Sequence, residues 1–106
     1  MMSTQERRRH PRSPAPPNLF IAWQTGLQQD VSRLGSLALG GLYIRTATPA
    51  PVRSMLRVLI ETPTGDLRAR VMVRRVAPKQ GMGVEFVAMT QEDRARLVQL
   101  LRRMAA

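Results

Sequence analysis

Residues 36–46 read Ser-Leu-Ala-Leu-Gly-Gly-Leu-Tyr-Ile-Arg-Thr, and the fold of the whole chain can be worked out from this stretch outward. Two apolar, β-prone runs meet at the pair Gly40-Gly41. This pattern predicts a strand, a sharp bend or bulge, and a second strand. Glycine has no Cβ atom, so the pair can turn tightly, and it can also let a ligand or another chain approach the backbone. The stretch alone favours an ordinary β-bend and leaves a binding role open.

Alternating and apolar runs on both sides of this stretch predict further short strands. The expected strands span residues 18–24, 31–39, 41–46, 55–62, 67–76 and 82–88. Pro63-Thr64-Gly65-Asp66 is typical of a hairpin turn, and residues 78–81 of a second turn. Between them, apolar residues alternate with arginines until the pattern slips by one position at residues 74–76, which indicates a bulge.

A helix is expected from Thr90 onward, with Thr90 as its N-cap and acidic residues in its first turn. Its apolar stripe is formed by Leu97, Val98, Leu100, Leu101 and Met104. The arginines in the last turn suit the negative end of the helix dipole, so they are expected to stabilise the helix rather than bind a ligand.

The N-terminal segment is polar and basic. Residues 1–5 are expected to be a disordered tail, and residues 6–106 a single domain. Four prolines within residues 11–17 exclude a helix there and favour an extended arm. The predicted fold is therefore mainly β: a six-stranded antiparallel β-barrel with a C-terminal α-helix and an extended N-terminal arm.

The charge of the chain is strongly unbalanced, with 17 Lys+Arg against 7 Asp+Glu and a net charge of +10. Lys79 is the only lysine. Arginine pairs well with phosphates and guanine edges, so an anionic partner is expected: a nucleotide, a nucleic acid or a membrane surface. No apolar run is long enough to cross a bilayer, so no membrane insertion is expected. The absence of cysteine fits a cytoplasmic location.

Enzymatic chemistry finds little support in the sequence. His10 is the only histidine and there is no cysteine, so neither a metal site nor thiolate catalysis is expected. The seven acidic residues show no paired spacing, and neither a nucleophile elbow nor a phosphate-binding P-loop is present. We therefore expect no catalytic residue, no metal and no cofactor.

Four motifs in order resemble the PilZ domain family, and the resemblance runs from about residue 6 to residue 103. The first is the arginine segment Arg8-Arg9-His10-Pro11-Arg12, and the second is Leu39-Gly40-Gly41-Leu42-Tyr43-Ile44. The third is the strand Gly81-Met82-Gly83-Val84-Glu85-Phe86, and the fourth is the helix that starts at Thr90-Gln91-Glu92-Asp93-Arg94. Each motif is weak alone, and their order makes the resemblance specific.

The resemblance implies a non-enzymatic receptor for the bacterial second messenger cyclic di-GMP that signals through an unidentified protein effector. It implies that Arg8 and Arg12 grip guanine edges and phosphates, with Arg9 assisting, and that the arm becomes ordered on binding. Arginine forks match both groups. The implied ligand-binding residues are Arg8, Arg9, Arg12, Ser36, Ala38, Gly40 and Gly41.

The second motif departs from the family pattern Asp/Asn-x-Ser-x-x-Gly. Counting back from Gly41 places Ser36 at the Asp/Asn position and Ala38 at the serine position. Losing both hydrogen-bonding groups would weaken binding by about 2–4 kcal/mol, or roughly 30- to 1,000-fold. Asp30-Val31-Ser32-Arg33-Leu34-Gly35 matches the pattern letter for letter, but the Leu-Tyr-Ile strand follows Gly41 and not Gly35, so we interpret it as a decoy.

Two other functions remain open at this stage. The chain can be a PilZ-like module that has lost the nucleotide and acts through protein contacts, as Ser36 and Ala38 suggest. It can also bind nucleic acid through the outward arginines Arg68, Arg70 and Arg74, but only four aromatic residues are present and several are expected in the core, which disfavours stacking on bases.

Overall fold

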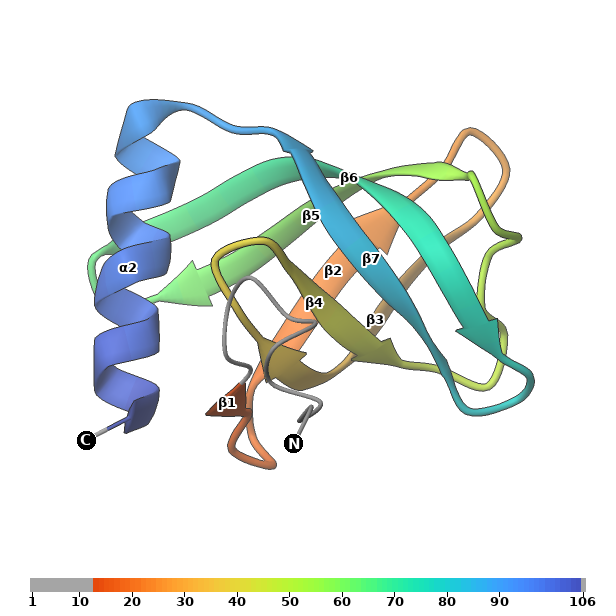
Figure 1. Cartoon of the computed structure of the whole chain (residues 1–106), viewed down its shortest axis with the longest axis horizontal. Helices are drawn as coiled ribbons and strands as arrows, with labels where there is room; N and C mark the ends of the chain where they lie inside the picture. The colour runs from red at the N-terminus through yellow and green to blue at the C-terminus, as the bar shows by residue number, and fades with distance from the viewer. Residues whose placement is uncertain (1–12, 106) are drawn as a thin grey trace, which may run out of the picture.

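The computed structural model describes residues 13–105. Seven strands precede one helix (Figure 1). The strands are β1 (Ser13–Pro14), β2 (Phe20–Gln24), β3 (Gln29–Leu37), β4 (Gly41–Arg45), β5 (Met55–Thr62), β6 (Gly65–Ala77) and β7 (Gly81–Ala88), and the helix is α2 (Gln91–Ala105).

The strands form one antiparallel sheet in the order β1-β3-β2-β5-β6-β7-β4, and an additional pairing of β3 with β4 closes it. β2 to β7 thus make a closed six-stranded barrel, and β1 is an extra strand paired only with β3. Closure removes the free sheet edges that would otherwise pair with other chains. The predicted fold class is confirmed.

Period-two alternation fills the barrel interior, as the sequence pattern predicts. On β6, Leu67, Ala69, Val71 and Val73 are buried, whereas the arginines between them are exposed. The same alternation on the other strands completes the core. Its largest fully buried side chains are Trp23, Ile21, Leu37, Leu42, Ile44, Leu56, Ile60, Leu67, Met82 and Leu97.

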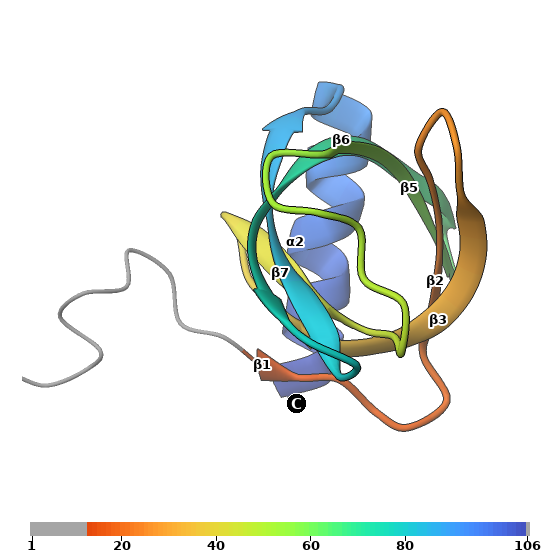
Figure 2. The ribbon, with the colours of Figure 1, turned by 90° about the vertical axis from the view of Figure 1, so that its right-hand side faces the viewer.

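Each end of the barrel is covered. Viewed along the barrel, α2 lies across one opening, and Leu97 and Leu100 are the buried residues of this helix (Figure 2). The connection between β4 and β5 crosses the other opening, and its Ala50 is fully buried. The predicted apolar stripe is therefore the side of α2 that packs on the barrel, with Leu101 and Met104 at its margin.

The hairpin formed by β3 and β4 contains the stretch with which the sequence analysis began. The predicted strand, bend and strand are confirmed, but β3 ends at Leu37 rather than residue 39. The hairpin closes there because the backbone N–H of Ala38 donates to the carbonyl of Gly41 at 2.9 Å. A register shift between Leu34 and Ser36 interrupts the alternation of side chains in β3, which the prediction of one strand over residues 31–39 does not include.

Two further expectations concern irregular backbone. The bulge expected at residues 74–76 is confirmed, since the β6–β7 register shifts between Val73 and Arg75. The expected arm over residues 11–17 is only partly right: Ser13 and Pro14 are extended, but they pair with β3 as a strand. This pairing cannot be predicted from the sequence, because a strand of two residues is too short to show an alternation of apolar and polar side chains.

The start of α2 is attached to β6 by Asp93. Thr90 is the N-cap, as predicted: its hydroxyl accepts from the Asp93 N–H at 3.0 Å and donates to the Asp93 carboxylate at 2.7 Å. The same carboxylate accepts from the backbone N–H of Arg68 at 3.0 Å. Burial raises the pKa of Asp93, but these hydrogen bonds and the nearby Arg96 and Arg68 guanidiniums outweigh it, so the pKa lies below its ordinary value.

Replacing Asp93 by Asn should lower the free energy of unfolding by about 1 kcal/mol at neutral pH, because the charged acceptor at the helix start is lost. A lowered folded-state pKa means that the stabilisation is complete above the unfolded pKa and disappears as the pH falls through the folded pKa. Urea unfolding followed by Trp23 fluorescence should therefore show the full difference at pH 7 and a progressively smaller one as the pH falls below the unfolded-state value of about 3.9.

Glu92→Gln is the matched control, because the Glu92 side chain is 77% exposed in the same helical turn. It should leave the stability unchanged within about 0.5 kcal/mol. A difference for Asp93→Asn that stays constant across this pH range would contradict the role of its charge.

Candidate ligand-binding face

The second motif lies on an outward row of residues that crosses five strands. Pro14 of β1 pairs with Ser36 of β3, which pairs with Tyr43 of β4. Tyr43 in turn pairs with Gly83 of β7, and Gly83 pairs with Arg75 of β6. We call these five residues the outer row. It brings residues as distant in the sequence as Pro14 and Gly83 onto one face of the barrel.

Tyr43 is held against the sheet by glycines on both neighbouring strands. A Cβ atom on Gly35 of β3 would lie 2.9 Å from Cδ2 of the tyrosine ring, and one on Gly81 of β7 would lie 2.6 Å from its hydroxyl oxygen. The ring therefore occupies space that any other residue at these positions would fill. The result is a half-buried aromatic ring lying along the outer surface.

Three arginines lie on this face: Arg75, which belongs to the outer row, and Arg33 and Arg45 beside the row. Arg75 passes over Gly83, where a Cβ atom would meet its Nε at 3.1 Å. Arg33 and Arg45 are exposed and directly opposite each other across β3 and β4. None of the three makes an ion pair with another residue in the described part of the chain. Like charges directly opposite each other are destabilising, so this face carries positive charge that no described acidic residue compensates.

The glycine pair has a packing role. A Cβ atom on Gly41 would overlap the carbonyl oxygen of Val84 and lie 3.2 Å from the Glu85 Cα atom. The carbonyl of Gly40 accepts a hydrogen bond from the Phe86 N–H at 2.9 Å. Both residues therefore fix the hairpin against β7, and the close approach of β7 accounts for the glycine at position 41 without any ligand.

The other two residues of the second motif differ in accessibility. Ser36 is half-buried on the outer row, whereas Ala38 is only 4% exposed at the hairpin bend. The structure thus brings Ser36, Ala38, Gly40 and Gly41 together at one end of the β3–β4 hairpin. Arg8, Arg9 and Arg12 lie outside the described residues, as does the tail 1–5.

The segment that matches the motif letter for letter is used differently. Ser32 faces the barrel interior, where it is 7% exposed and accepts a hydrogen bond from the indole N–H of Trp23 at 2.9 Å. Asp30 is exposed and bonds its own neighbour, the N–H of Val31. These contacts explain Ser32 as a partner for a buried tryptophan and argue against its contacting a ligand on the outer face.

Four residues of this face were not among the site residues predicted from the sequence: Tyr43, Arg33, Arg45 and Arg75. Tyr43 and Arg45 have a signal, since period-two alternation from Gly41 puts them on one face. Arg33 is out of phase with Ser36 and lies on the outer face only because the β3 register shifts between Leu34 and Ser36. Arg75 could not be placed because the bulge in β6 decides its direction.

Residues 13–105 contain no group of three or more His, Asp or Glu side chains that could hold a metal ion. The one helix of this part is neither long nor apolar enough to cross a bilayer.

The fold defines a class: small closed antiparallel β-barrels with one C-terminal helix. The sequence matches the PilZ domain family over residues 6–103, and the chain belongs to that family. The resemblance drawn from the four motifs is thereby confirmed. No curated protein sequence matches this chain.

Solved structures share the fold at low identity. The inhibitor of motility MotI/DgrA of Bacillus subtilis matches with a TM-score of 0.76 and 21% identity, over 92% of this chain and 51% of that one. The PilZ domain of YcgR from Escherichia coli, solved with c-di-GMP, matches with a TM-score of 0.76 and 14% identity, over 93% and 92% of the two chains. The present chain spans about half the length of MotI/DgrA.

Gly41→Ala should lower the free energy of unfolding by about 1–3 kcal/mol, because the methyl group has only backbone atoms of β7 to displace. Gly26→Ala is the control: a Cβ atom there meets nothing within 4 Å, so its effect should stay within about 0.5 kcal/mol. Urea unfolding measures both variants. Equal stability of the two would show that Gly41 is not required for strand packing.

Proposed function

We propose that this protein is a non-enzymatic receptor for cyclic di-GMP that acts in the cytoplasm through a protein partner. The ligand lies on the outer row, with the arginines of the N-terminal segment closing over it. Arg8, Arg9, Arg12 and the second-motif residues Ser36, Ala38, Gly40 and Gly41 form the site, together with Tyr43 and Arg75.

The pairing of β1 with β3 is the observation that carries this proposal. Ser13 is opposite Leu37, and Pro14 is opposite Ser36. Arg12 precedes Ser13, and consecutive Cα atoms are about 3.8 Å apart. The arginine segment is therefore bonded to a strand that lies next to the second motif, on the face where Arg33, Arg45 and Arg75 have no ion-pair partner among the described residues.

The chemistry of this face matches the chemistry of the ligand. Cyclic di-GMP presents two phosphates and two guanine bases, which suit arginine forks for both the phosphate oxygens and the guanine O6/N7 edge. Tyr43 offers a flat aromatic surface against which a base can stack. The family membership and the c-di-GMP bound to the PilZ domain of YcgR support the same choice.

A second function is favoured by one specific observation. Ser36 and Ala38 replace the Asp/Asn and Ser of the family pattern, so the chain can be a protein-interaction module that no longer binds the nucleotide. In that case the arginines of the outer row would bind another anion, such as an acidic segment of a partner protein.

Isothermal titration calorimetry with cyclic di-GMP should give binding that Arg8→Ala and Arg12→Ala each weaken by about tenfold or more, since each removes a charged, bidentate contact. Arg102→Ala is the control of equal charge change, located in the last turn of α2. It should leave the affinity unchanged. No heat and no competition up to near-millimolar ligand would reject the receptor and favour the interaction module.

Ser36→Asp should tighten binding, because a carboxylate can accept from guanine N1–H and N2–H where a hydroxyl offers one weaker bond. The gain expected is about 1 kcal/mol or more, roughly fivefold or greater. Adding Ala38→Ser should contribute less, since that position is only 4% exposed. The same calorimetry checks both variants, and an unchanged affinity for Ser36→Asp would place the ligand elsewhere.

A further inference from the structure

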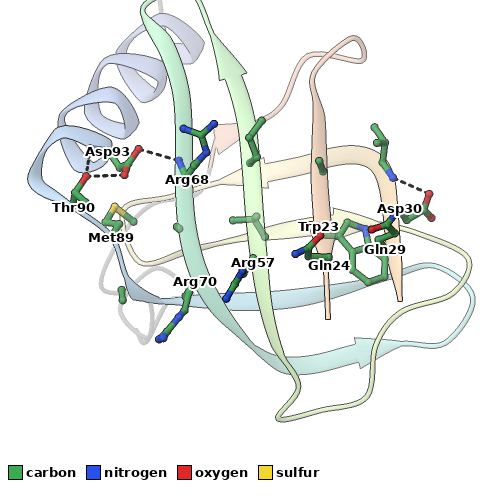
Figure 3. Close-up of a pocket in the computed structure, with 16 residues that line it drawn as sticks. Trp23, Gln24, Gln29, Asp30, Arg57, Arg68, Arg70, Met89, Thr90 and Asp93 are labelled. Carbon is green, nitrogen blue, oxygen red and sulfur yellow. Dashed lines mark hydrogen bonds between the residues drawn. The ribbon is translucent and has the colours of Figure 1, made fainter. Parts of the chain in front are cut away.

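A groove of about 960 Å³ lies on the outside of the barrel, away from the outer row. It crosses β3, β2, β5 and β6 and reaches the start of α2 (Figure 3). In the closed order of strands, β5 is opposite β4, so the centres of the groove and of the candidate ligand-binding face lie on opposite sides of the barrel, while β3 and β6 contribute different residues to both. The second motif contributes no residue to it.

Two cross-strand rows line the groove, and they differ in character. The apolar row runs from Val31 through Ala22 to Leu59, and Val31 is 65% exposed. Beside it, Gln24 pairs with Arg57, and Arg57 pairs with Arg70. The groove thus has an apolar strip next to a polar and basic strip, which is the pattern of a surface for an amphipathic partner.

The arginine pair of this groove has no neutralising partner. Arg57 and Arg70 are directly opposite each other and exposed, and their side chains project the same way (Figure 3). Neither forms an ion pair with another residue of the described range 13–105. Directly opposed like charges destabilise a sheet, so an anionic partner bound here would reduce the electrostatic repulsion between Arg57 and Arg70.

The two acidic residues at the ends of the groove do not supply that neutralisation. Asp93 is occupied by Thr90 and by the backbone N–H of Arg68. Asp30 accepts from the N–H of Val31 at the far end. The basic strip therefore remains open to a ligand.

We propose that this groove is a docking surface for an acidic, amphipathic helical segment of a partner protein. The apolar side of such a helix packs on the Val31–Ala22–Leu59 row, and its carboxylates pair with Arg57 and Arg70. Three interstrand steps separate β3 from β6, roughly 14 Å, which about three helical turns span.

Two other occupants fit less well. Single-stranded nucleic acid is bound largely by stacking of its bases on aromatic rings, but the only aromatic residue lining the groove is Trp23, which is 1% exposed. A second copy of this chain would bring its own charge of +10 against the basic strip. Charge complementarity thus selects an acidic protein segment.

The test uses the full chain and a synthetic amphipathic peptide of about 14 residues, with leucines on one helical face and glutamates on the other. In amide NMR spectra, the peptide should shift the signals of Ala22, Leu59 and Arg68. The same peptide with lysines replacing the glutamates should bind at least about tenfold more weakly.

Arg57→Glu combined with Arg70→Glu should weaken the acidic peptide by about tenfold or more. Arg102→Glu combined with Arg103→Glu changes the net charge equally in the last turn of α2 and should have little effect. Because charge reversal can disturb folding, Arg57→Gln is measured too: it should weaken the peptide while unfolding at the same or a higher urea concentration, since a like-charge contact is removed.

Three results would overturn the proposal. These are equal weakening by both double variants, amide shifts confined to the Arg33–Arg45 face, and displacement of the peptide by single-stranded DNA with shifts at the same amides. Cyclic di-GMP is absent from every arm of this experiment, so its outcome is independent of whether the outer row binds the nucleotide.

Discussion

The close contact between Gly41 and the backbone of β7 is the constraint on which the rest of the structure depends. The sheet becomes a barrel only because β4 pairs with β3 on one side and with β7 on the other. At Gly41 the β7 backbone is so near that a Cβ atom would overlap the Val84 carbonyl. The same hairpin carries Ser36 and Ala38 and pairs with β1. The β3–β4 hairpin therefore both closes the barrel and positions the residues of the candidate site. Glycine is required at position 41 for strand packing, whether or not a ligand binds.

The sequence predicted the parts that follow from local patterns. Alternation located the six barrel strands, the slip at residues 74–76 located a bulge, and the Thr90 cap located the helix start. The parts it missed depend on pairing between distant residues. No local signal shows that Ser13–Pro14 joins β3, that Tyr43 lies across Gly35 and Gly81, or that the bulge turns Arg75 over Gly83.

The segment 30–35 shows that matching residue types predict a binding motif less reliably than the position of the motif relative to the following strand. Its aspartate, serine and glycine have the right spacing, yet Ser32 is turned into the core to satisfy the indole of Trp23. A strand alternates its side chains between two faces, so a residue's face depends on where the strand begins and where it bulges. The register of the following strand, which starts at Gly41, was the informative feature.

The distribution of arginine on the barrel fits the two anionic partners proposed above. Two like-charged pairs lie directly across neighbouring strands, Arg33 with Arg45 and Arg57 with Arg70. Each arrangement is unfavourable in isolation, and the ion pairs of the described residues involve other arginines, as that of Glu85 with Arg74 does. The two pairs occupy opposite sides of a rigid barrel. Under the two proposals above, a nucleotide on one face and an acidic protein segment on the other would use different arginines, so the two could be bound at once.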